Sequence, residues 1–120
     1  MSQITLNTPF ELPNGSRLPN RIAKSAMSEA LGTMDNRATP ELVELYRRWG
    51  QGGTGLIITG NVMIDRKALG EPGNVVIEDD RDLDTLRAWA EAGKSGGGQI
   101  WVQLNHPGRQ CPKGLNQETV

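Results

Sequence analysis

The feature that most constrains the fold is a continuous apolar run, residues 55–60, that lies between two amphipathic helical patterns. A run of strand length without polar alternation is typical of a parallel strand buried on both faces, whereas a half-exposed antiparallel strand alternates. Segments of strand length also precede the first helical pattern, at residues 21–27, and follow the second, at residues 99–104. Strands separated by helices favour right-handed parallel crossovers. The sequence therefore predicts an α/β fold.

Both predicted helices have recognisable ends. Thr39 can cap the first helix, which begins at Pro40 because proline suits the first helical position. Aspartates within residues 79–82 supply caps and early negative charge to the second helix. Glycines at residues 50–53 and 93–98 end the two helices. Helical periodicity predicts core faces formed by Leu42, Leu45, Tyr46 and Trp49 in the first helix and by Leu83, Leu86, Trp89 and Ala90 in the second.

Two segments lie outside this alternation. Residues 10–12 and 16–18 flank the turn Pro13-Asn14-Gly15, which predicts a hairpin because Asn and Gly both tolerate a positive φ. Residues 105–120 carry proline, glycine and polar groups, which is typical of a loop.

The lengths of the connections locate the predicted functional site. The helix-to-strand connections are short, whereas the strand-to-helix connections, residues 28–39 and 61–81, are much longer. Parallel α/β proteins build their active sites from the loops at the carboxyl ends of the strands. We therefore expect the chemistry at Met27–Ser28, Gly60–Asn61 and Gln103–His106.

Small side chains gather at the ends of the first two strands. They leave room for a flat ligand, although small residues in a barrel interior also serve packing. The residues concerned are Ser25, Ala26 and Ser28 around Met27, and Gly60 on the next strand.

Polar side chains stand at the end of the third strand. Gln103 closes an otherwise buried strand with an amide, which costs free energy on burial unless a partner satisfies it. The pyrimidine edge of a flavin would satisfy the amide, and so would neighbouring backbone. His106, the sole histidine, is either a structural hydrogen-bonding group or a functional one.

Other patterns exclude several function classes. Residues 50–55 match G-x-G-x-x-G, but the motif leaves a helix and opens a strand, which is the wrong context for a dinucleotide loop. Thirteen basic against 14 acidic side chains give no reason to expect a nucleic-acid or membrane partner. Cys111 is the only cysteine, so we expect no internal disulfide, no thiolate metal site and a cytoplasmic location. We expect neither a signal peptide nor a bilayer-spanning helix.

Three motifs in order resemble the NADH:flavin oxidoreductase, or Old Yellow Enzyme, family. Residues 9–15 with 18–22 look like the family's opening hairpin and first strand. Residues 52–60 look like its second strand, and Gln103-Leu104-x-His106-x-Gly108-Arg109 looks like its third-strand signature. The resemblance runs over nearly the whole chain and implies the N-terminal part of a (β/α)₈ TIM barrel, with about three βα units after the hairpin.

The resemblance implies an activity and a set of cofactor contacts. Members of the family carry FMN, which NADH or NADPH reduces and which then reduces the C=C bond of an α,β-unsaturated carbonyl or enoyl substrate, as in ene-reductases and 2,4-dienoyl-CoA reductases. Backbone at residues 25–27 would meet the flavin, Ser28 would replace a Thr or Cys that adjusts its redox behaviour, Gly60 would let the ring approach, and Gln103 would bind its pyrimidine portion. We expect only a supporting role at the site rim for His106 and Arg109.

The sequence departs from the family in two ways. Ala26 stands where the family usually has proline, which keeps a backbone contact but reduces local rigidity. The family's substrate-binding His/Asn pair, proton-donating Tyr and FMN phosphate loop would all lie beyond residue 120, so no catalytic residue is assigned. A barrel needs eight strands and typically ~250 residues. We therefore expect an incomplete single domain over residues 1–120 that is inactive by itself.

A second hypothesis involves no flavin. Unclosed parallel strands would leave a strand edge and an apolar face exposed, which favours association with another chain. The chain could then be a non-catalytic α/β module that docks with a partner, or it could form a homo-oligomer through this edge.

Overall fold

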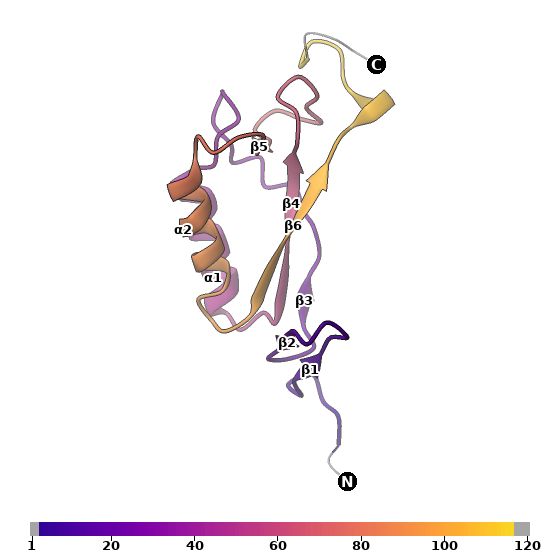
Figure 1. The fold of residues 1–120 in the computed structure, drawn as a ribbon, viewed down its shortest axis with the longest axis vertical. Helices are drawn as coiled ribbons and strands as arrows, with labels where there is room; N and C mark the ends of the chain where they lie inside the picture. Colours follow the sequence, from indigo (N-terminus) through magenta and orange to yellow (C-terminus); the bar gives the residue numbers. More distant parts are fainter. Residues whose placement is uncertain (1–2, 117–120) are drawn as a thin grey trace.

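The computed structural model describes residues 3–116, and its centre is a parallel sheet (Figure 1). Strand β4 (Leu56–Met63) pairs in parallel with β3 (Ala23–Lys24), β5 (Val75–Val76) and β6 (Gln99–Asn105). Since β6 pairs with β4 from Leu56 to Met63, β3 and β5 must share the opposite edge of β4. The predicted α/β fold with parallel strands is confirmed.

The strands differ from the sequence prediction in length and number. The first strand covers only two residues instead of 21–27, while the second continues through Gly60 to Met63. Strand β5 was not predicted, because its two valines lie in what the sequence indicates as a long loop. As a result, Gly60 and Asn61 lie within β4 rather than after it.

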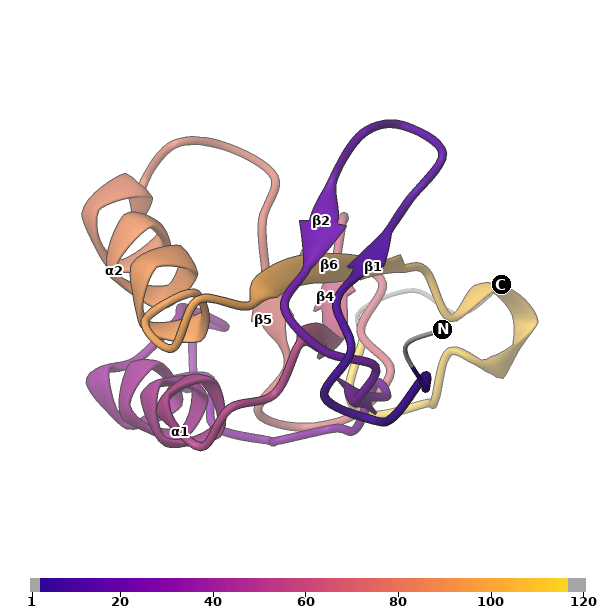
Figure 2. The ribbon, with the colours of Figure 1, turned by 90° about the horizontal axis from the view of Figure 1, so that it is seen from below.

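Both helices lie on the same side of the sheet, as Figures 1 and 2 show. Helix α1 covers Pro40–Gln51, and α2 covers Leu83–Gly93. The core between helices and sheet contains Leu42, Val43, Tyr46, Ile57, Val62, Val75, Trp89 and Ala92. The opposite face has no helix over it in the described part of the chain (Figure 2), and Trp101 on β6 is 44% exposed.

The helix ends confirm one predicted cap and correct another. Thr39 caps α1, since its Oγ1 accepts a hydrogen bond from Leu42 N at 3.2 Å. Asp82 makes no capping bond to α2, because its carboxylate instead pairs with Arg37 at 2.6 Å. Leu83, predicted to face the core, is 52% exposed at the first turn of α2.

The predicted hairpin is confirmed at the opposite end of the sheet from the carboxyl ends of the strands (Figure 1). Strands β1 (Phe10–Glu11) and β2 (Arg17–Leu18) pair antiparallel, and Gly15 has a φ of 88° in the turn. After β6, the segment predicted as loop contains a short 3₁₀ helix, Gly108–Gln110; residues 117–120 lie outside the described part.

Candidate functional site

The three predicted site positions lie together in the carboxyl halves of neighbouring strands. A Cβ added to Gly60 would come under 3.0 Å from the carbonyl oxygen of Met27, so the backbone after β3 passes directly over β4. One residue further along β4, Asn61 is the register partner of Gln103 on β6. Segments far apart in the sequence therefore form one surface, as predicted.

An irregularity in the β4–β6 pairing shapes this surface. The register shifts between Ile58 and Asn61, and the Thr59 side chain fills the gap. Its Oγ1 accepts a hydrogen bond from Gln103 N at 3.0 Å and donates to Gly60 O at 2.9 Å. Bulges of this kind re-aim side chains and are common beside active sites. Gly60 lies within this irregular stretch of β4, and Gln103 pairs with the residue directly after it. Both are positions predicted to contact a flat ligand.

Gln103 finds a polar partner in Asn61, a predicted site position whose contact with Gln103 the sequence did not predict. Its Nε2 donates to Asn61 Oδ1 at 2.5 Å, which is a side-chain partner rather than the neighbouring backbone expected as one alternative. Asn61 and Gln103 are both half-buried. Since each amide carries a donor group and an acceptor, the pair can still offer both to a ligand. The signal in the sequence was an amide directly after Gly60 on an otherwise apolar strand.

The segment of small residues after β3 faces solvent at this site. Ser25, Met27 and Ser28 are exposed and Ala26 is half-buried. Met27, which has the largest side chain of these four residues, is 51% exposed. The exposed Met27 side chain and the exposed segment around it are thus available for contact with a flat ligand.

Glu29 and Tyr46 form a second feature that sequence reasoning missed. The Tyr46 hydroxyl donates to the Glu29 carboxylate and accepts a hydrogen bond from Gly60 N at 3.1 Å. Burial, reinforced by the hydrogen bond to Glu29, raises the pKa of the Tyr46 phenol far above its usual value. Tyr46 was expected only as a core residue, because its helical spacing predicts burial but not a polar partner.

A small polar hollow of about 250 Å³ lies beside these residues. It is lined by Ser28, Asn61, Gly70, Glu71, Asn105, His106, Pro107 and Gln110. His106 Nδ1 accepts a hydrogen bond from Gly108 N at 2.9 Å, which leaves the proton of the neutral ring on Nε2. His106 is exposed at the edge of this hollow, which agrees with a place at the site rim.

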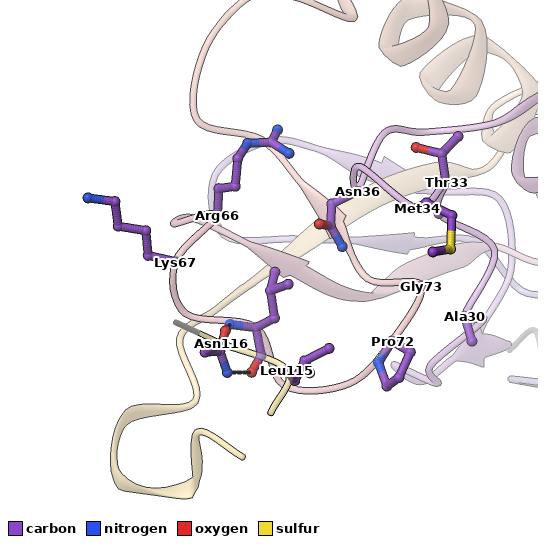
Figure 3. Close-up of a pocket in the computed structure, with 12 residues that line it drawn as sticks. Ala30, Thr33, Met34, Asn36, Arg66, Lys67, Pro72, Gly73, Leu115 and Asn116 are labelled. Atoms are coloured by element: carbon purple, nitrogen blue, oxygen red, sulfur yellow. Dashed lines mark hydrogen bonds between the residues drawn. The ribbon is translucent and has the colours of Figure 1, made fainter. Parts of the chain in front are cut away.

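A larger cavity of about 980 Å³ contains none of the predicted cofactor residues (Figure 3). The loops at residues 30–36 and 66–73 line it together with Leu115 and Asn116. Figure 3 shows Lys67 extending away from the other labelled residues, and Arg66 is held by Glu78 at 2.8 Å. We therefore place the candidate site at the strand ends, where the small and polar side chains meet.

Comparison with known proteins decides the family. The model of the NADH:flavin oxidoreductase / NADH oxidase family matches residues 5–120. The chain belongs to this family. It is 37% identical to the NADH-dependent flavin oxidoreductase iliE of Hypocrea jecorina over 118 residues, which are 95% of this chain and 29% of that protein. It is 40% identical to the NADH:fumarate oxidoreductase of Klebsiella pneumoniae over 84% of this chain and 11% of that one.

Solved structures of the family share the fold. The Old Yellow Enzyme homologue of Zymomonas mobilis matches with a TM-score of 0.82 and 27% identity, over 92% of this chain and 30% of that one. Morphinone reductase matches with a TM-score of 0.80 and 29% identity, over 98% of this chain and 30% of that one. The chain therefore has the fold of the N-terminal part of the family's TIM barrel, and it spans under a third of these relatives' length.

The arrangement at the strand ends fits the flavin that the family name implies. Because Gly60 has no side chain, Met27 and Glu29 lie close against β4, and the exposed Met27 side chain is left for contact with a planar ring. The Asn61–Gln103 pair carries the donor and acceptor groups that a pyrimidine edge requires. Separately, neither α1 nor α2 combines the length and hydropathy needed to span a membrane, within residues 3–116.

Proposed function

We propose that residues 1–120 are the N-terminal part of a single FMN-dependent TIM-barrel domain and form one wall of its flavin site. The whole protein would use NADH or NADPH to reduce the C=C bond of α,β-unsaturated carbonyl or enoyl compounds. The observation that carries this proposal is that Gly60 and Gln103, in the carboxyl halves of β4 and β6, lie at the same end of the parallel sheet as Met27, which follows β3. This is where a parallel barrel holds its ligands.

The residues of this chain would bind and orient the cofactor. Bound FMN would supply the hydride chemistry between the nicotinamide and the substrate. The backbone of residues 25–27 would contact the ring system, and the Ser28 hydroxyl would lie at its edge. Gly60 would act by letting Met27 and Glu29 lie close against β4 beside the ring. Gln103, held by Asn61 at 2.5 Å, would present its amide to the pyrimidine portion.

Relatives support the choice of substrate class. The Klebsiella relative is named for NADH and fumarate, and fumarate is an unsaturated dicarboxylate. A mutant of morphinone reductase, whose solved structure matches this chain with 26% identity, has been solved in complex with tetrahydroNAD. We propose the same type of reductant and an activated C=C bond for this protein. A cytoplasmic location, also proposed, agrees with the single cysteine.

The test uses the protein expressed from its whole reading frame. We expect yellow protein with flavin absorption bands, bleached anaerobically by NADH or NADPH and restored by 2-cyclohexenone with loss of the enone absorbance. Separate titrations with the two nucleotides give the preferred reductant. Protein that is colourless, and that stays colourless with added FMN, would refute the proposal.

A second candidate function follows from exposed apolar side chains on and beside the outer strands of the sheet. Four of them are at least 44% exposed, and those on β6 point to both faces of the sheet: Ile22, Trp101, Val102 and Leu104. In the first proposal these side chains face the rest of the same barrel; in the second they dock another chain, without flavin. Light scattering of the 120-residue chain with and without FMN separates the two: a colourless, stable dimer or hetero-complex would favour docking.

A further inference from the structure

The segment proposed to meet the flavin, residues 25–28, is held at both ends by charged side chains. At its start, Lys24 Nζ donates a hydrogen bond to the Ser25 carbonyl oxygen at 2.6 Å. At its end, the Glu29 carboxylate accepts hydrogen bonds from the Tyr46 hydroxyl and, at 3.4 Å, from Gly60 N. The backbone between these two anchors is therefore tied down on either side.

Both anchors are supported by the same aromatic cluster, which is formed by helices α1 and α2. Tyr46 is 0% exposed, and its ring meets those of Trp49 and Trp89 edge-on at 5.0 and 5.3 Å between centroids. Lys24 Nζ lies 4.6 Å from the centre of the Trp49 ring. Side chains packed at interior density move little, so this cluster is a rigid support. Lys24 and Glu29 also attract each other electrostatically.

Glu29 also occupies the space that a side chain at position 60 would fill. A Cβ there would come under 3.0 Å from the Glu29 carboxylate as well as from the Met27 carbonyl oxygen. One carboxylate thus connects three elements: the segment after β3, helix α1 through Tyr46, and strand β4 through Gly60 N. A carboxylate fully surrounded by water would make none of these contacts, so the position of the Glu29 side chain is fixed by the protein.

We propose that Lys24 and Glu29 are positioning residues that fix the flavin-contacting backbone of residues 25–28 on helix α1. This inference rests on the function proposed above. Contacts made through backbone depend on where the chain lies, and a site is precise only when neighbouring groups hold it within a fraction of an ångström. Loosening either anchor should weaken flavin binding without removing any group that touches the flavin.

The test measures FMN binding in variants of the protein expressed from its whole reading frame. Glu29→Ala and Lys24→Met should each raise the Kd for FMN about tenfold, as expected for loss of one hydrogen bond to a charged group. Glu29→Gln keeps an oxygen that can accept from the Tyr46 hydroxyl, so its Kd should stay within about threefold of wild type. Fluorescence titration gives the Kd, and the visible spectrum of bound FMN reports any displacement.

Val43→Ala is the matched control, because Val43 is buried on the same helix and lines the hollow between α1 and α2. It should lower the unfolding free energy but leave the Kd within about twofold of wild type. An equal loss of FMN affinity in this variant would overturn the positioning role, as would unchanged Kd and spectrum in both Glu29→Ala and Lys24→Met. Failure of the wild-type protein to bind FMN would instead overturn the proposed function.

Discussion

Gly60→Ala tests most directly how closely the strand ends approach one another. No positive φ is recorded for Gly60, so alanine meets no backbone restriction there. The added methyl group, however, would lie under 3.0 Å from the Met27 carbonyl oxygen and from the Glu29 carboxylate. Glu29 can move only by giving up its bonds to Tyr46 and Gly60, and Met27 can move only with its backbone.

The size of the effect follows from these contacts. Overpacking that forces backbone shifts typically costs about 1–3 kcal/mol. We therefore expect the unfolding free energy to fall by about 1–3 kcal/mol, which is about 5-fold to 150-fold in the folding equilibrium. Part of the cost should disappear in a Glu29→Ala background, because only the clash with Met27 then remains.

Urea unfolding followed by tryptophan fluorescence measures the unfolding free energies of the wild-type protein and of Gly60→Ala. The dependence of that free energy on urea concentration should be the same for both if they unfold in the same way. Gly70→Ala is the control: an added Cβ there meets only Asn74 Oδ1 at 3.6 Å and Met63 Cε at 3.8 Å, which are ordinary contacts. It should be neutral or stabilising by up to about 1 kcal/mol. If Gly60→Ala proves as stable as Gly70→Ala, the close approach of the strand ends is wrong.

Three further predictions concern the cap, the site amide and an exposed carboxylate. Thr39→Ala removes the cap of α1 and should lower the unfolding free energy by about 1 kcal/mol in the same urea assay. Asn61→Ala frees the Gln103 amide and should weaken FMN binding about fivefold by fluorescence titration, with little change in stability. Hydrogen bonds from Arg81 lower the pKa of Asp79 to about 2, so this pairing favours the folded state above about pH 4 and is lost as the pH falls toward 2. Carbon-13 NMR titration should show that pKa, and Arg81→Ala should return it toward 3.8.

Much of the fold could be predicted because its signals are local. The cap at Thr39, the Asn-Gly turn and the unbroken apolar run each depend on a few adjacent residues, and each prediction is confirmed. Predictions failed where a distant partner competes. Asp82 was expected to cap α2, but it pairs with Arg37, 45 residues away, because a guanidinium binds a carboxylate more strongly than a neutral N–H does.

Short strands form another limit of sequence reasoning. Val75 and Val76 make strand β5 only because β4 offers them a free edge at Val62 and Met63. Two residues carry no periodicity of their own, so nothing local distinguishes such a strand from loop. Beyond Gly60, where the apolar run in the sequence is interrupted, β4 continues to Met63 because it pairs with β5 on one edge and with β6 on the other.

The sequence by itself determined the order of elements, the parallel sheet and the end of that sheet at which polar and small residues gather. Only the tertiary structure decided which side chains meet there: Gln103 with Asn61, and Glu29 with Tyr46 over Gly60. The physical reason is the distance along the chain between the residues that interact. Periodicity, caps and turns are encoded between neighbours, whereas a hydrogen bond between residues 17 or 42 positions apart exists only once the crossovers have brought the strand ends together.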